Sequence, residues 1–130
     1  MDKDDETDIF VWIDYGIFKQ HHITADAIRK FLFEVALRGS ATHIAAPGLI
    51  DPAPVDWGQF HTRFCGSVVV IPRALVDEYR SRMGGTAALH MINSRTLSWE
   101  VNYLAEIERD CSLPIRQYKA WWDASQFTNY

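Results

Sequence analysis

The sequence has few cysteines and no long apolar run. Cys65 and Cys111 are its only two cysteines, too few for a disulfide framework, and no CxxC pair is present for zinc binding or thiol exchange. No apolar segment approaches the ~20 residues that a membrane helix needs. The first residues, MDKDDETD, lack the basic and apolar regions of a secretory signal. We therefore expect a cytoplasmic protein without a transmembrane segment.

Basic charge and the common signature motifs are also scarce. The 13 Lys and Arg residues are scattered among 17 Asp and Glu residues, and the formal net charge is -4. This argues against a nucleic-acid partner, because a surface that follows phosphates needs clustered basic residues. There is no Walker loop, GxGxxG, GxSxG or HExxH motif, and the histidines do not pair at helical spacing. These absences disfavour the common NTPase, dinucleotide-binding, hydrolase and zinc-protease activities, and metal binding by histidine.

Length and composition fit one folded domain. The chain has 130 residues, of which 48% are hydrophobic and 23% charged. Residues 1–8 form an acidic run that we expect to be a flexible lead-in, and residues 9–130 form the folded part. Apolar runs alternate with helical patterns, which predicts an α/β fold with a small mixed sheet flanked by helices. We expect buried strands at 9–14 and 68–71, a short strand near Ile44, and helices at 25–37, 73–83 and 99–110.

Local signals predict where these helices begin and end. Thr24 and Ser98 are suitable N-caps for the first and last helices, because a hydroxyl can accept a hydrogen bond from a free backbone N–H. Pro72 suits the first turn of the second helix. Gly39 is expected to end the first helix, and the MGG triplet at 83–85 the second. The aromatic tail beyond Pro114 has no clear period, so no element is predicted there.

Three acidic residues lie in settings where carboxylates do chemistry. Asp14 follows a buried strand, where α/β folds often place ligand groups, although it could equally cap a turn. Glu100 opens a helix, where it could act on a substrate or simply stabilise the helix dipole. Asp123 follows two tryptophans and could be an ordinary loop residue. Cys65 is better interpreted as a small core residue than as a nucleophile.

The tryptophans allow two interpretations. Their rings could offer apolar faces to sugars, or they could fill the core. Core burial is the favoured interpretation for Trp12, and less so for the pair in the tail that includes Trp122.

Five segments in a fixed order resemble a known family. FVWIDYGIF, HITADAIRKF, RFCGSVVVIPRALVDEY, LSWEVNYLAEIERD and WWDASQFTNY together resemble the catalytic half of the HtrL/YibB-like glycosyltransferases, which are of GT-A type. The resemblance covers most of the chain from Ile9 onward and implies the acceptor-side half of a GT-A fold. The strand end Asp14-Tyr15-Gly16 departs from the family pattern, because it lacks the second aspartate of the DxD motif.

The resemblance also implies roles for single residues. A divalent cation, Mn²⁺ or Mg²⁺, would be held on the donor diphosphate by carboxylates, the ligands that such ions prefer. A carboxylate near the sugar would stabilise positive charge in the transition state or deprotonate the acceptor hydroxyl. The implied metal ligands are Asp14 and Asp123, the implied catalytic residue is Glu100, and the substrate-binding residues are Cys65, Gly66, Ser67, Trp99, Asn102 and Trp122.

The expected function is therefore transfer of a sugar from a nucleotide-sugar donor to a hydroxyl acceptor. Only 13 residues precede Asp14, whereas GT-A enzymes place a nucleotide-binding half before this strand. We accordingly expect a homodimer or a partner chain to supply or cover that side, and the sequence leaves open whether the chain is active alone. The alternatives are a non-catalytic remnant that binds a carbohydrate or a partner chain, and a structural α/β interaction domain.

Overall fold

A computed structural model of the chain describes residues 9–14, 17, 23–38, 42–49, 51, 53–61, 63–110, 112–121 and 123–130. The acidic lead-in, Gly39 and Trp122 lie outside the described residues. The elements in chain order are β1 (Ile9–Ile13), α1 (Ala25–Arg38), β2 (Ile44–Gly48), β3 (Val68–Pro72), the 3₁₀ helix η2 (Arg73–Leu75), α2 (Val76–Ser94), α3 (Glu100–Arg109), β4 (Ile115–Lys119) and α4 (Ser125–Thr128).

The four strands form one open mixed sheet in the order β1-β3-β2-β4. β1 and β2 both pair with β3 in the antiparallel direction, and β2 pairs with β4 in parallel. The predicted α/β architecture, with a small mixed sheet and flanking helices, is confirmed. β4 was not predicted, because its residues, IRQYK, alternate only loosely between apolar and polar.

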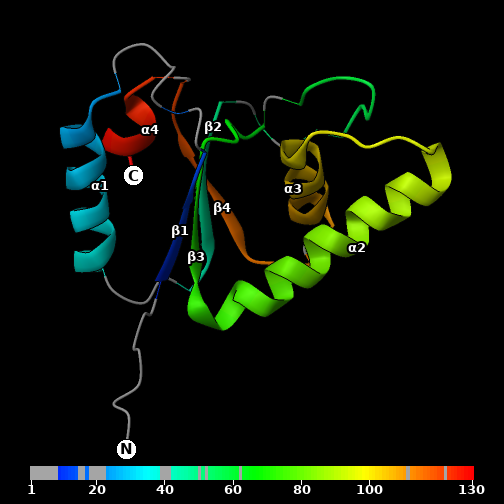
Figure 1. Cartoon of the computed structure of the whole chain (residues 1–130), viewed down its shortest axis with the longest axis horizontal. Coiled ribbons are helices and arrows are strands. Elements are labelled where there is room, and N and C mark those ends of the chain that lie inside the picture. The colour runs from blue at the N-terminus through cyan, green and yellow to red at the C-terminus, as the bar shows by residue number, and fades with distance from the viewer. Residues whose placement is uncertain are drawn as a thin grey trace, which may run out of the picture.

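Helices cover both faces of the sheet and make three layers (Figure 1). α1 and α4 lie on one face, and α3 and α2 lie on the other. The first face buries Val68, Val70 and Phe31, and the second buries Ile44, Val69 and residues of α3. Alternate residues of the central strand β3 therefore serve two cores, as expected of a strand with both faces covered.

The prediction that β1 is buried is wrong in part. β3 is buried throughout, as predicted, but β1 lies at the sheet edge and only every second residue is sheltered. Trp12 pairs with Val69 across the two strands, yet its side chain is 45% exposed, and Phe10 is 41% exposed. α2 runs obliquely away from the sheet (Figure 1), and the side chains of Trp12 and Phe10 stay partly open to solvent.

The start of α1 agrees with the sequence signals. The Thr24 hydroxyl accepts a hydrogen bond from the Ala27 N–H at 3.2 Å, as the N-cap prediction requires. Ser98 does not cap α3: its hydroxyl donates to the Trp57 carbonyl at 3.2 Å and accepts from Asn102.

The expected break at 83–85 is wrong, because α2 continues through Gly84 and Gly85 to Ser94. A glycine costs a helix about 1 kcal/mol relative to alanine, too little to end one whose inner face is packed. Met83, just before the two glycines, packs against the core, and His90, beyond them, stacks on Trp57 with ring centroids 4.6 Å apart. α2 instead ends at Arg95, whose φ is 58°. None of the helices in the described ranges is both long and apolar enough to cross a membrane.

Candidate functional site at one end of the sheet

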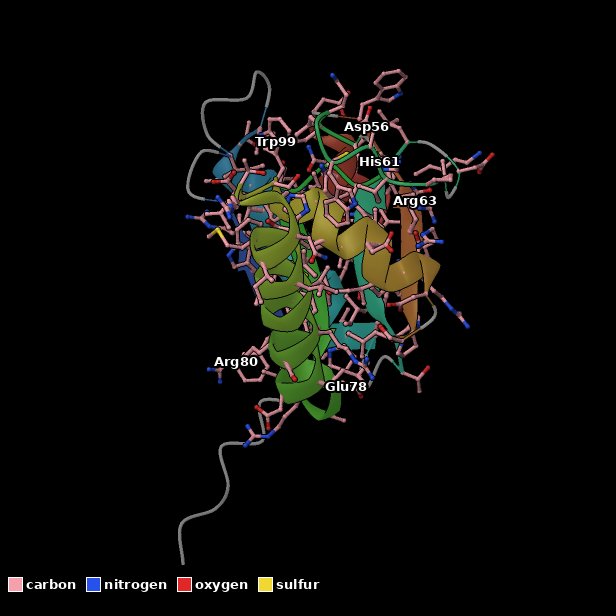
Figure 2. The ribbon with its side chains drawn as sticks, turned by 90° about the vertical axis from the view of Figure 1, so that its right-hand side faces the viewer. Asp56, His61, Arg63, Glu78, Arg80 and Trp99 are labelled. Atoms are coloured by element: carbon pink, nitrogen blue, oxygen red, sulfur yellow. The ribbon has the colours of Figure 1, made fainter. Side chains whose placement is uncertain are left out.

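The strand directions bring most of the predicted site residues to one end of the sheet. The C-terminal ends of β1, β2 and β4 and the N-terminal end of β3 all meet there. In open α/β sheets, ligands commonly bind outside the carboxyl ends of strands. Figure 2 shows Trp99, His61 and Arg63 at this end of the molecule, with Glu78 and Arg80 at the opposite end. We call the first of these the site end.

Asp14 is fixed at the site end by the backbone. Its N–H donates to the Ser67 carbonyl at 2.9 Å, and its own carbonyl accepts from the Ile17 N–H at 3.0 Å. The first bond extends the pairing of β1 with β3 by one residue, so the end of β1 and the start of β3 are held together. The residue is partly exposed.

The Cys65-Gly66-Ser67 segment forms the turn into β3. The Cys65 N–H donates to the Pro47 carbonyl at 2.8 Å, and its thiol donates to the Ala120 carbonyl at 3.5 Å. Burial, followed by the charge of the nearby Asp123 carboxylate, raises the pKa of the Cys65 thiol to about 12. The thiol is therefore protonated at neutral pH, which agrees with a small core residue and not with a nucleophile.

Gly66 is the member of this turn that contacts the start of α3. Its φ of 68° lies in the region that favours glycine. A Cβ at this position would lie 2.6 Å from Cγ1 of Val101 and 3.5 Å from Oε1 of Glu100. Cys65 and Ser67 are buried, and the Gly66 backbone lies close to the Glu100 carboxylate.

Trp99, Glu100 and Asn102 start α3 but have different environments. Trp99 is 46% exposed and meets the ring of Phe60 edge-on at 5.9 Å, and Glu100 is also exposed. Asn102 is completely buried. Its amide accepts from the His61 N–H and donates to the Gln59 carbonyl, each at 2.8 Å.

Asn102 therefore attaches the loop before β3 to α3. Its amide group is used inside the protein, and its side chain does not lie on a surface that a sugar would touch. The two exposed neighbours of this residue, Trp99 and Glu100, remain accessible to a ligand.

Asp123 follows β4 and lies near the Cys65 turn, because the Cys65 thiol donates to the carbonyl of Ala120, three residues before Asp123. One of its carboxylate oxygens accepts from the Ser125 N–H at 2.8 Å, at the start of α4. Asp14 and Asp123 thus come to the same end of the sheet from opposite ends of the chain. Among the residues that the structure describes, no group of three or more histidine, cysteine or acidic side chains could hold a metal ion.

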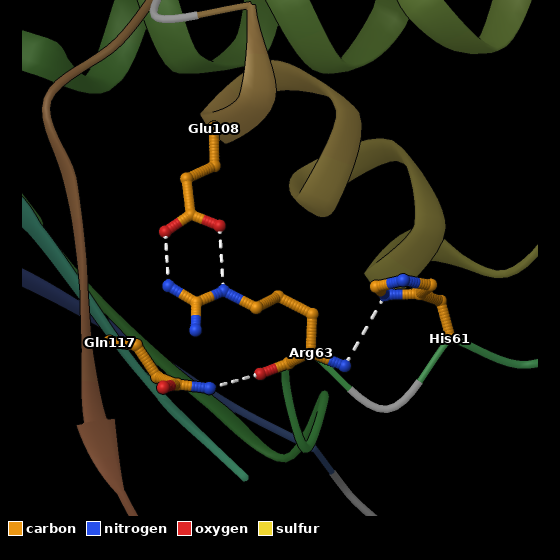
Figure 3. Close-up of polar contacts among 4 residues, drawn as sticks. All are labelled: His61, Arg63, Glu108 and Gln117. Carbon is orange, nitrogen blue, oxygen red and sulfur yellow. Dashed lines mark hydrogen bonds and ion pairs between the residues drawn. The ribbon is translucent and has the colours of Figure 1, made fainter. Parts of the chain in front are cut away.

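A polar network that the sequence did not reveal anchors the loop before β3 (Figure 3). The Arg63 guanidinium donates from Nε and Nη2 to the two carboxylate oxygens of Glu108, at 2.7 and 2.5 Å. The Gln117 side chain donates to the Arg63 carbonyl at 2.5 Å, and the Arg63 N–H donates to Nδ1 of His61 at 3.3 Å. Arg63 and Glu108 are 45 residues apart, so no local pattern could have paired them.

An apolar cavity also opens beside Glu100. It measures about 290 Å³ and lies between the β1–β3 edge of the sheet and the two helices α2 and α3. Glu100 is the acidic residue of its lining, and Trp12 and Tyr79 are among its aromatic walls. No local pattern in the sequence could show that these side chains enclose a cavity, because they come from a strand and a helix far apart in the chain.

Comparisons with protein-family models, with curated proteins and with solved structures each return no match. The likeness to HtrL/YibB-like transferases therefore depends on the five sequence segments alone.

Proposed function

We propose that the site end of the sheet transfers a sugar from a nucleotide-sugar donor to a hydroxyl acceptor, as in the GT-A-type family that the sequence resembles. The observation that carries the proposal is the convergence of residues that are far apart in the sequence. The Asp14 N–H donates to the Ser67 carbonyl, and the Gly66 backbone lies close to the Glu100 carboxylate. The charge of Asp123 contributes to the raised pKa of the Cys65 thiol. A catalytic site assembled from several strand ends is the usual arrangement in α/β enzymes.

Glu100 is the catalytic residue in this proposal. Its exposed carboxylate accepts the proton of the acceptor hydroxyl while the new bond forms between the acceptor oxygen and the anomeric carbon. The bond from that carbon to the diphosphate breaks, and its electron pair leaves with the nucleoside diphosphate. Trp99 offers an exposed aromatic face to a sugar ring.

Asp14 and Asp123 are the residues that would hold a divalent cation. Carboxylate oxygens suit Mg²⁺ or Mn²⁺ better than histidine or thiolate would. When bound, such an ion would neutralise charge on the leaving diphosphate. Because two protein carboxylates are few for a hard cation, we expect weak Mn²⁺ binding by the protein alone and stronger binding with a nucleoside diphosphate. Calorimetry of the wild type and of Asp14→Ala tests this, and tight binding by Asp14→Ala without nucleotide would exclude the assignment.

Turnover of nucleotide sugars tests the proposed function directly. A panel of donors is incubated with the protein and Mn²⁺, and release of nucleoside diphosphate is followed. Glu100→Gln should lower the rate by about 100-fold or more, the usual contribution of a general base. Glu78→Gln is the matched control, because Glu78 lies at the opposite end of the molecule (Figure 2). Equal rates in the two variants, or no turnover of any donor, would contradict the proposal.

A second candidate function is a non-catalytic domain that binds a partner chain, including a second copy of this one. It is favoured by the exposed apolar side chains of the second half of α2 and the loop after it. Leu89, Ile92 and Leu97 are between 60% and 75% exposed, and such clusters often mark interaction surfaces. A cytoplasmic location is part of the same set of proposals and is supported by the small number of cysteines in the sequence.

A further inference from the structure

The cavity beside Glu100 has the size and lining of a small-molecule site. A cavity of about 150 Å³ lined by aliphatic and aromatic side chains can bind benzene. The present cavity, at about 290 Å³, has roughly twice that volume. It can therefore take a bicyclic aromatic group or an aliphatic chain of similar bulk.

The walls of the cavity are almost entirely apolar. Val69 and Ile71 of β3 form its base, Leu104 of α3 one side, and Met83 of α2 another. Trp12 of the edge strand closes part of the remaining side and is itself 45% exposed. Transfer of an apolar ligand from water into this cavity would lower the free energy, because the ligand would contact these side chains instead of water.

Two polar groups lie in the lining of this apolar space. Glu100 is exposed and lines the cavity, so its carboxylate marks the opening. The half-buried Tyr79 ring lines the same cavity as Glu100, and burial, followed by the charge of Glu100, raises the pKa of the Tyr79 hydroxyl. A ligand with an apolar body and one hydrogen-bond donor would match this arrangement.

We propose that the cavity binds the apolar body of an alcohol or phenol and presents the ligand's hydroxyl group to the carboxylate of Glu100. This deepens the proposed function and rests on it for one point only, that the bound hydroxyl is the acceptor of the sugar. The acceptor would then be an aromatic or aliphatic hydroxyl compound and not another sugar. Gly66 contributes by keeping the turn into β3 close to Val101 and Glu100, where a side chain would not fit.

The transfer balances with the groups named. The hydroxyl proton goes to Glu100, the ligand oxygen bonds to the anomeric carbon of the donor, and the nucleoside diphosphate departs with the electron pair. The released product is an amphiphile with a sugar at its polar end.

A binding experiment without donor or metal tests the cavity by itself. The ¹⁵N-labelled full chain is titrated with 2-naphthol and, separately, with 2-methylnaphthalene, which has a methyl group in place of the hydroxyl. Both probes should shift the indole N–H signal of Trp12, assigned with Trp12→Phe, and the backbone signals of Val69 and Leu104. If the wild-type protein showed signal shifts only at residues outside the cavity, that result alone would overturn the proposal.

Variants separate the roles of the wall and of the carboxylate. Met83→Trp, which fills the cavity, should weaken both probes about tenfold or more, whereas Ala88→Trp at an exposed position of α2 should leave binding unchanged. Glu100→Ala should weaken 2-naphthol about tenfold and 2-methylnaphthalene hardly at all, because only the hydroxyl bonds to the carboxylate. Equal losses for both probes in Glu100→Ala, or full binding by Met83→Trp, would overturn the proposal.

The outcomes also separate this inference from the proposed function. Binding of 2-naphthol as expected, with no turnover of any nucleotide sugar, would support the cavity and reject glycosyl transfer. Donor turnover that is unchanged in Met83→Trp, together with no binding of 2-naphthol, would support transfer and reject the cavity as its acceptor site.

Discussion

The pair formed by Arg63 and Glu108 offers the clearest test of what holds the site end together. Only 8% of the Arg63 side chain and 13% of the Glu108 side chain are exposed. Replacing Glu108 by alanine leaves the guanidinium in a largely buried place without its carboxylate. Breaking a buried ion pair costs about 3–5 kcal/mol, and we expect about 3 kcal/mol because both side chains keep some contact with water.

This loss is large relative to the stability of a small domain, about 5–15 kcal/mol. For a chain of this length, 1 kcal/mol corresponds to roughly 3–5 °C in Tm. The Glu108→Ala protein should therefore remain folded at 25 °C but melt about 10–15 °C below the wild type. Thermal unfolding followed by circular dichroism, supported by urea titration, measures both quantities.

The neighbouring pair on the same helix supplies the control. Arg109 and Glu106 are also joined at 2.5 Å, but their side chains are 49% and 24% exposed. Exposed pairs contribute little because water screens them and the side chains lose entropy. Glu106→Ala should therefore lower the Tm far less than Glu108→Ala does.

A double replacement examines the reasoning from the other direction. Arg63→Met with Glu108→Leu removes both charges and keeps apolar bulk, so it should recover most of the stability that Glu108→Ala loses. Equal effects of Glu108→Ala and Glu106→Ala, or a double variant no more stable than Glu108→Ala, would refute the argument that burial makes this pair important.

Three further predictions concern other parts of the fold. Because the pKa of the Cys65 thiol is raised from 9.0 to about 12, the thiol of the unfolded state loses its proton at a lower pH than the thiol of the folded state. With Cys111 replaced by serine in both proteins, raising the pH from 8 to 10 should lower the free energy of unfolding by about 1.4 kcal/mol more when Cys65 is present than in Cys65→Ser, as urea titration measures. Equal losses in the two proteins would contradict this. Gly48→Ala should unfold the domain or lower its Tm severely, because a Cβ there collides with the Arg63 carbonyl, and a near-normal melting curve would show that the loop can move aside. Light scattering after size exclusion should show association that grows with concentration and disappears in Ile92→Glu, whereas a wild-type monomer at every concentration would argue against the exposed face of α2 as a contact surface.

Several elements follow from local patterns that the structure confirms. The apolar run at 68–71 becomes a fully buried strand, and the Thr24 hydroxyl caps α1 as expected. These features depend on side-chain size, apolar spacing and backbone hydrogen bonding over a few residues, which are visible in the sequence. The mixed sheet with helices on both faces follows from the alternation of such patterns.

The failures have a common cause. MGG resembles a helix end, but Met83 before the glycines packs against the core and His90 beyond them stacks on Trp57, so α2 continues. Ser98 resembles an N-cap, but its hydroxyl hydrogen-bonds to the Trp57 carbonyl and to the Asn102 amide. In each case a contact with a distant part of the chain outweighs a local preference of about 1 kcal/mol.

The candidate site shows the same division between sequence and tertiary structure. The sequence shows which acidic residues are available at a strand end, at a helix start and in the tail, because residue types and local patterns can be identified without a fold. The three-dimensional packing is needed to show that Asp14, Glu100 and Asp123 share one end of the sheet, that the Asn102 amide bonds within the protein, and that a cavity opens beside Glu100. These outcomes depend on strand order and on the angle between α2 and the sheet, which are set by packing between segments many residues apart and leave no periodic trace in the sequence.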